Sequence, residues 1–167
     1  LNKDNITSKN YADSIIDITK YVQHKSFPAV GYFLKGYWCY QLSEYQESLH
    51  NYLIGDSIAK VRKNITQYIG NRKMIALLKN RAGNYQGALK MYLKEIDSLN
   101  LIKKENSVNY TEYLNRVYNT SLTYMHLKNL DSARIYSKRG LTESLKIKDT
   151  LSYFDFVYNL GVIDYLS

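Results

Sequence analysis

Residues 79–96 read KNRAGNYQGALKMYLKEI, and the same pattern of small, polar and aromatic residues occurs twice more in the chain. The other two copies are SEYQESLHNYLIGD at residues 43–56 and LDSARIYSKRGL at residues 130–141. The three stretches align on small residues that lie 40 and 45 positions apart: Ser48, Ala88 and Ala133. A fixed period of about 20 to 50 residues is typical of a solenoid, in which one structural unit is repeated along the chain.

A second set of small residues lies 12 positions before the first set, at intervals of 40, 45 and 40: Gly36, Ala76, Ser121 and Gly161. One small residue on each of two helices lets their backbones approach closely where the helices cross. Tyrosines lie three residues before Ser48 and Ala88 and four residues after them, which places them on the same helical face. We therefore expect all seven small residues to pack at helix contacts, with the partner of Gly161 lying beyond Ser167.

The composition favours an all-α fold. The 167 residues are 45% hydrophobic and 23% charged, as in a folded domain, and they include only 8 Gly and 1 Pro to form turns. Helices are predicted at residues 9–25, 29–42, 45–64, 68–82, 85–104, 110–127, 130–147 and 150–166. The longest connection is expected at residues 104–109, and the absence of a Gly-, Ser- or Pro-rich linker predicts one continuous array.

This pattern resembles the tetratricopeptide repeat (TPR) family, whose units carry small residues at their eighth and twentieth positions with aromatic residues around them. The resemblance covers nearly the whole chain and is strongest at residues 79–96 and 117–141. It implies a right-handed α–α superhelix of antiparallel helix pairs over residues 1–167. Its expected parts are a partial repeat (1–28), three repeats (29–68, 69–113 and 114–153) and the first helix of a truncated repeat (154–167).

The spacing departs from the common unit of about 34 residues. Units of 40 and 45 residues resemble the extended repeats of kinesin light chains and of bacterial signalling proteins. The proline that usually ends a unit is also missing. Longer helices or connections are therefore expected.

In this family the first helix of each unit lines a concave groove, so the resemblance implies that outward-facing residues of these helices contact a peptide. The candidates are Phe33, Tyr37, Tyr40, Lys73, Leu77, Asn80, Arg81, Asn115, Tyr118, Asn119, Leu122, His126, Tyr158 and Asn159. Asn119 and Asn159 each follow Val-Tyr at the sixth position of a unit, where asparagines of related proteins pair with the ligand backbone. A side-chain amide offers both a donor and an acceptor. The alternative is that these amides only satisfy a backbone group in the preceding turn.

Basic residues are concentrated at residues 60–104, which hold 11 Lys or Arg against Glu95 and Asp97. Such a surface attracts acidic partners over a Debye length of about 8 to 10 Å, so we expect an acidic protein segment as the partner. A solvated face, or a contact with a neighbouring domain, would explain the same charge. The alternative function is nucleic-acid binding through residues 60–104, because basic residues interleaved with tyrosines can hold a single strand. Most of the 18 tyrosines, however, are already assigned to repeat packing.

The sequence predicts a chain without enzymatic activity, metal or cofactor. It holds no glycine-rich phosphate loop and no nucleophile motif. The single cysteine, Cys39, excludes an internal disulfide and is interpreted as a buried hydrophobic residue. The three histidines, His24, His50 and His126, lack the spacing of a metal site.

The chain is interpreted as part of a larger protein. It starts without an initiator methionine or signal peptide, and no apolar run approaches the roughly 18 residues that span a membrane. The residue pattern of stretches such as residues 124–141 resembles that of repeat regions in bacterial sensors and transcription regulators, especially of Bacteroidetes. This implies a sensing or docking role with open terminal repeats available for self-association. The compartment stays open between the cytoplasm and, for a membrane-anchored regulator, the periplasm.

Overall fold

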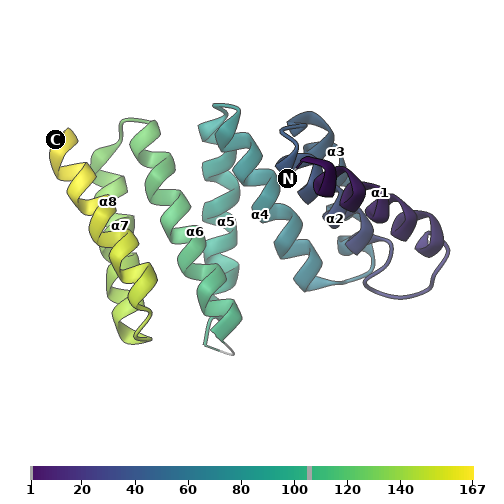
Figure 1. The fold of residues 1–167 in the computed structure, drawn as a ribbon. Coiled ribbons are helices and arrows are strands. Elements are labelled where there is room, and N and C mark those ends of the chain that lie inside the picture. Colours follow the sequence, from purple (N-terminus) through teal and green to yellow (C-terminus); the bar gives the residue numbers. More distant parts are fainter. Residues whose placement is uncertain (1, 105–106) are drawn as a thin grey trace. The chain divides into compact units, whose positions relative to one another are not determined.

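The computed structural model of the chain describes residues 2–104 and 107–167, which form eight α-helices and contain no strand (Figure 1). The helices are α1 (Asn2–Thr19), α2 (Ala29–Gln41), α3 (Tyr45–Val61), α4 (Ile65–Arg81), α5 (Tyr85–Ile102), α6 (Ser107–His126), α7 (Leu130–Lys146) and α8 (Thr150–Leu166). α1, α2 and α3 pack in succession, as do α5, α6, α7 and α8, which confirms the predicted all-α helical repeat. None of these helices is long and apolar enough to span a bilayer.

Most predicted helix ends agree with the structure to within three residues, and the largest difference is at α1. This helix begins at Asn2 rather than at residue 9 and ends at Thr19 rather than at residue 25. The N-terminal half of α1 is polar and lacks the apolar periodicity that would predict a helix. In the structure, Lys9 and Asp13 form ion pairs with residues of α2, of α3 and of the turn between them, and these pairs favour a helix there. The predicted connection at residues 104–109 includes Glu105 and Asn106, which lie outside the described residues.

One type of turn joins the helices at five places. In each, a residue with positive φ stands two positions before the next helix: Ser43, Lys63, Gly83, Lys128 and Lys148. The residue after it returns a backbone hydrogen bond into the preceding helix, as from the Glu44 amide to the Cys39 carbonyl oxygen at 2.8 Å. This pattern ends a helix through a left-handed residue. Asn84, Asn129 and Asp149 then cap the helices that follow by accepting a hydrogen bond from a backbone amide.

The chain divides into two compact units, and each is described by itself. Unit 1 is Leu1–Leu78 and unit 2 is Lys79–Ser167, with the boundary inside α4. In unit 1, α1 packs on α2 and α2 on α3. In unit 2, α5, α6, α7 and α8 pack in succession and α6 also contacts α8.

Six of the seven small residues are buried, as close helix packing requires. Gly36 of α2 is buried, and an added Cβ would lie 3.0 Å from the Tyr52 ring of α3. In α6 and α7, Ser121 and Ala133 are fully buried and in hydrogen-bond contact, and Ala76 and Ala88 are fully buried as well. Gly161 is exposed and an added Cβ would meet no atom within 4 Å, and because its expected partner lies beyond Ser167, its role at a helix contact stays a prediction. Its side of α8 has no helix packed on it among the described residues.

Candidate functional site

A row of partly exposed side chains runs along α6 in unit 2. Asn115, Tyr118 and Leu122 are half-buried and His126 is exposed, and their spacing places them on one helical face. Tyr118 also packs edge-on against Phe156 of α8, with ring centroids 5.9 Å apart. This row therefore lies beside α8, which contacts α6 directly.

α8 continues the same surface. Asp155 and Tyr158 are exposed on α8, and burial, followed by the nearby Asp155 and Tyr158, raises the pKa of Tyr118. We call Asn115, Tyr118, Leu122, His126 and Tyr158 together the α6–α8 surface. It offers amide, imidazole and phenol groups for hydrogen bonding beside apolar area.

The end of α4 that belongs to unit 2 borders α6. Asn80 donates a side-chain hydrogen bond to the Thr123 hydroxyl at 3.3 Å, which places Asn80 against α6. Arg81, the next residue, is exposed. A positive charge thus lies on the α4 side of α6, whereas Asp155 supplies a negative charge on the α8 side.

The two asparagines singled out in the sequence behave differently from the expectation for ligand contacts. The Asn119 amide donates to the Asn115 carbonyl oxygen at 2.8 Å and to the Asn115 side-chain oxygen at 3.2 Å. This is the alternative in which the amide satisfies the preceding turn. Asn159 is fully buried on the face of α8 that also carries Phe156 and Ile163, so the prediction that it contacts a ligand is wrong.

The candidates in unit 1 are mainly packing residues. Phe33 packs edge-on against Tyr52 at 5.5 Å and closely approaches Gly70. Tyr40 packs against Tyr45 at 5.7 Å. Both therefore help to join α2 to α3, which explains why aromatic residues stand there without invoking a ligand. Tyr37 is exposed on α2, and Lys73 and Leu77 are half-buried on α4.

The basic residues 60–104 do not all face solvent. Arg62 donates to the backbone oxygens of Val22 and His24 at 2.8 and 2.6 Å. Lys103 is buried, donates to Glu143 at 2.6 Å and lies 4.1 Å from the centroid of the Tyr113 ring. Arg62 and Lys103 therefore hold the fold together. The exposed Lys and Arg residues of this stretch are divided between the two units.

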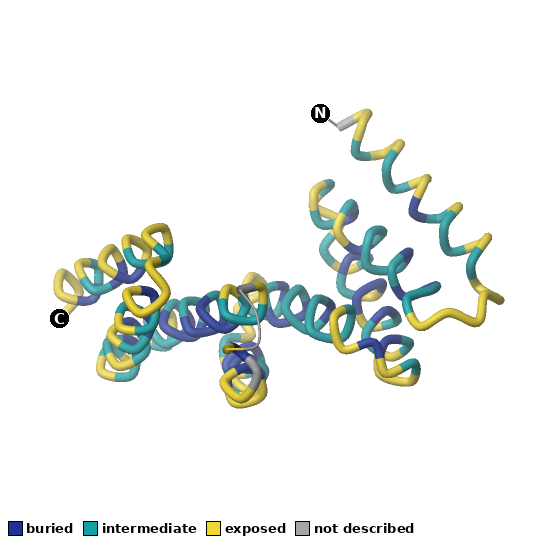
Figure 2. Tube along the Cα trace, turned by 90° about the horizontal axis from the view of Figure 1, so that it is seen from below, coloured by how far each residue is buried: buried dark blue, intermediate teal, exposed yellow. Residues whose placement is uncertain are grey.

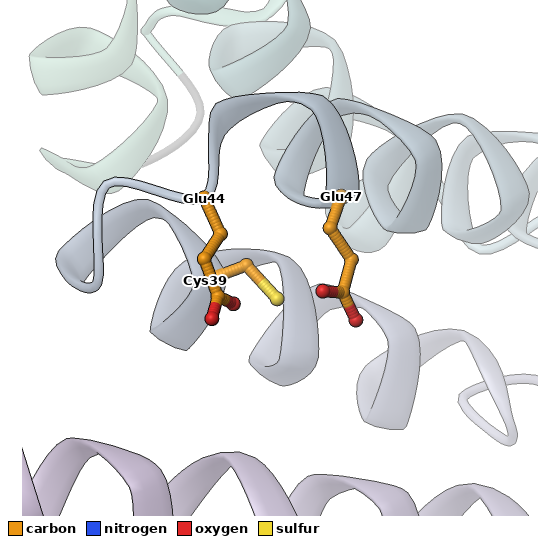
Figure 3. Close-up of side chains that lie close together, drawn as sticks. All are labelled: Cys39, Glu44 and Glu47. Atoms are coloured by element: carbon orange, nitrogen blue, oxygen red, sulfur yellow. The ribbon is translucent and has the colours of Figure 1, made fainter.

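A cluster of potential ligand groups in unit 1 was not predicted from the sequence. The Cys39 sulfur and one carboxylate oxygen each of Glu44 and Glu47 lie within 4.8 Å of one another (Figure 3). The Lys9 ammonium donates to both carboxylates, at 2.6 and 3.0 Å. We interpret the cluster as an ion-pair network that ties α1 to α2 and α3, because Lys9 already supplies the cation.

Protonation in this cluster agrees with that interpretation. Burial alone would lower the pKa of Lys9, but its hydrogen bonds to Glu44 and Glu47 raise it above the usual value. The hydrogen bond from Lys9 lowers the pKa of Glu47. Burial, followed by the charge of Glu47, raises the pKa of the Cys39 thiol to about 12. Cys39 is buried as predicted and is neutral at physiological pH, so it is a poor nucleophile.

A second unexpected feature is a buried ion pair between α5 and α6. Arg116 is fully buried and donates to Glu95 at 2.5 Å and to Glu112 at 2.7 Å. The spacing of Glu112 and Arg116 suits a surface pair on one helix, and nothing in the sequence near Arg116 places Glu95 opposite it. The pair is internal and contributes no group to the α6–α8 surface.

Comparison with known proteins adds no relative to this picture. No protein-family model matches the chain, and a search of curated proteins finds no similar sequence.

Proposed function

We propose that this chain is a non-catalytic repeat module of the TPR type that binds an extended peptide on the α6–α8 surface. The observation that carries the proposal is the row of partly exposed side chains on α6, which continues onto exposed Asp155 and Tyr158 of α8. The described residues leave this row accessible. The antiparallel helix pairs and their small crossing residues support the assignment to the TPR type.

The chemistry of the surface suits a peptide better than a small polar ligand. Its amide, imidazole and phenol groups recur along the helix. They can therefore bond to successive donors and acceptors of an extended peptide backbone that lies beside it. Leu122 and the two tyrosine rings provide apolar area for side chains between these polar contacts. Exposed Asp155 at the α8 edge disfavours an acidic residue at that end of the peptide.

The test is selection of peptides from a random library on the 167-residue chain at physiological salt. Asn115→Ala combined with Leu122→Ala should raise the Kd of the selected peptides at least tenfold, which corresponds to a loss of about 1.4 kcal/mol in binding free energy. Gln86→Ala, at an exposed position of α5, is the matched control and should leave the Kd unchanged. Tyr118 is left unchanged because it packs against Phe156, and Asn119 because its amide bonds the preceding turn. The Asn115 side-chain oxygen accepts a hydrogen bond from Asn119 at 3.2 Å, so circular dichroism should show unchanged helicity in the double variant.

Two results would count against the proposal. Peptides that bind the double variant and the parent equally well would place the binding site elsewhere. Tight binding of a single-stranded oligonucleotide, with affinity falling steeply as salt increases, would instead favour the nucleic-acid alternative.

The biological setting we propose is the sensing or docking part of a larger bacterial regulatory protein. The support for it is the resemblance of the repeat stretches to those of bacterial sensors and transcription regulators. In such a setting the repeat array would recruit an acidic segment of a partner protein, and other parts of the regulator would respond.

A further inference from the structure

A lysine and a tyrosine recur at the junction between successive repeat units. Each lysine lies 15 residues after an aligned small residue of a second helix, and each tyrosine lies eight residues before an aligned small residue of a first helix. The pairs are Lys63 with Tyr68, Lys103 with Tyr113, and Lys148 with Tyr153. The first two pairs lie in the interior of the chain, with several helices on either side, and the structure arranges them differently.

At the junction of α5 and α6, a group of the chain itself completes the pair. The Lys103 ammonium lies 4.1 Å from the centroid of the Tyr113 ring and donates to Glu143 of α7 at 2.6 Å. Lys103 keeps a nearly helical φ of −57° and is buried. A carboxylate thus holds an ammonium group on a tyrosine ring.

At the junction of α3 and α4, the corresponding pair lies open to solvent. Exposed residues, yellow in Figure 2, gather at the turns between helices, and this turn is one of them. Lys63 has a φ of 54° and is exposed, as is Lys60 one turn earlier. The repeat register gives a reason for the difference. The residue aligned with Glu143 is Ser98, so the earlier unit offers no carboxylate at this position.

A cavity of about 370 Å³ lies beside the open pair, and we call it the α3–α4 cavity. Its lining consists of Ala59, Lys60, Lys63, Asn64, Ile65 and Tyr68. The Asn64 side chain is engaged within the fold, because it accepts from the Gln67 amide at 3.2 Å and donates to the Lys25 carbonyl oxygen at 3.2 Å. The cavity therefore offers apolar walls, a tyrosine ring and two exposed ammonium groups.

The size and charge of the α3–α4 cavity indicate what fits it. Its volume is near the lower end of the range of about 300 to 1,000 Å³ for small-molecule pockets, which suits one side chain of a longer ligand. Ile65 is 67% exposed, so an apolar side chain gains by covering it. The two lysines favour carboxylates beside that side chain. The α5–α6 junction shows the same choice, since Glu143 is the group that meets the aligned lysine there.

We propose that the α3–α4 cavity binds an acidic segment of a partner protein, with one aliphatic side chain in the cavity and flanking glutamates on Lys60 and Lys63. The partner supplies from outside the carboxylate that Glu143 supplies from within at the α5–α6 junction. The cavity lies wholly in unit 1, whereas the α6–α8 surface lies in unit 2. The inference therefore goes beyond the peptide binding proposed for that surface and does not depend on it.

Titration of the 167-residue chain with short peptides, followed by ¹H–¹⁵N NMR spectra at physiological salt, tests the proposal. The probe is the acetylated and amidated peptide GELEEG. It should shift the backbone amides of residues 59–68 with a Kd of about 0.1 to 1 mM. The peptide GEAEEG lacks the aliphatic side chain and GQLQQG lacks the charges, and each should show a Kd at least fivefold higher.

Two pairs of substitutions test the lysines. Lys60→Gln combined with Lys63→Gln should raise the Kd for GELEEG at least fivefold. Lys128→Gln combined with Lys138→Gln is the matched control, because both lysines are exposed and Lys128 also has a positive φ, of 58°. It removes the same charge and should bind like the parent, and thermal unfolding should show that both variants stay folded.

The same titration separates this site from the α6–α8 surface. Asn115→Ala combined with Leu122→Ala should leave the binding of GELEEG unchanged, so the failure of one proposal leaves the other standing. Equal affinity for GEAEEG and GELEEG would overturn the inference, because it would mean that charge acts without a seated side chain. So would shifts confined to amides outside residues 59–68, or no shift with up to about 5 mM peptide. Tighter binding of a single-stranded oligonucleotide to the same amides would assign the cavity to nucleic acid instead.

Discussion

Two contacts between successive helices of unit 2 occupy the same place in the repeat and are filled in opposite ways. Glu95 and Gly140 each lie seven residues after an aligned alanine, Ala88 or Ala133. At the α5–α6 contact Glu95 bonds to buried Arg116. At the α7–α8 contact the Phe156 ring lies over Gly140, where an added Cβ would come within 2.1 Å of it. An aromatic ring over a glycine joins the helices at one contact, and an ion pair joins them at the other.

Unit 1 contains a third version of this contact. Gly55 of α3 lies seven residues after Ser48, and Asn71 of α4 packs so closely on it that an added Cβ would lie 2.8 Å from the Asn71 side-chain oxygen. The three contacts share a position in the repeat but differ in chemistry and in the size of the two side chains. The repeat therefore constrains where successive helices meet, and it leaves open whether the contact is apolar, amide or charged.

Loss of Arg116 should have the largest effect. Arg116→Met leaves Glu95 buried without its cation, and breaking such a pair costs about 3 to 5 kcal/mol in the free energy of unfolding. Urea denaturation followed by circular dichroism measures it. Glu95→Gly combined with Arg116→Phe copies the α7–α8 contact and should recover most of the loss. If the double variant is no more stable than Arg116→Met, the two contacts are not interchangeable.

The Lys103–Glu143 pair should show a pH-dependent effect of about 3 kcal/mol. Burial alone would raise the pKa of Glu143, but hydrogen bonds from Lys103, Lys146 and Tyr110 lower it to about 2. Because the unfolded pKa is near 4.3, the carboxylate stabilises the fold above about pH 4.3 and loses this effect as the pH falls toward 2. The difference in unfolding free energy between the parent and Glu143→Gln should shrink over that window. A difference in unfolding free energy that does not change with pH would contradict this prediction.

Gly140→Ala should cost about 1 to 3 kcal/mol, because the added methyl group overlaps the Phe156 ring in a packed contact. Gly161→Ala is the matched control, since its methyl group meets nothing and alanine favours a helix over glycine by about 0.5 to 1 kcal/mol. Thermal unfolding of the two variants should therefore shift in opposite directions. An unchanged melting temperature for Gly140→Ala would mean that the Phe156 ring moves to make room for the methyl group without loss of stability.

The smallest effects should come from the two hydroxyls at the helix crossings. Ser48 of α3 donates to the Gly36 carbonyl of α2, whereas Ser121 of α6 donates to the Ala133 carbonyl of α7. The bond thus runs from the second helix to the first in unit 1 and from the first to the second in unit 2. Ser48→Ala and Ser121→Ala should each cost about 1 kcal/mol, measured by urea denaturation. Very different values would show that the direction of the bond matters.

Part of the candidate site could be predicted from the sequence. The spacing of Asn115, Tyr118, Leu122 and His126 places them on one face of α6, and the structure leaves that face partly exposed. Asn159 shows where such prediction fails. Its sequence context is the same as that of Asn119, yet α8 turns it toward its buried face. Exposure depends on which neighbouring helices cover a face, and no local pattern contains that information.

The amino-acid sequence by itself determined the class of fold, the helices and most of the small crossing residues. It did so because helix formation and the close approach of two helices depend on residue types at fixed local spacings. Only the tertiary structure decided which charges pair across helices: buried Arg116 bonds to Glu95, and Lys9 bonds to Glu44 and Glu47. These partners lie 21 to 38 residues apart in the chain. Their pairing follows from how the helices pack, because an ion pair forms only where packing brings opposite charges within reach.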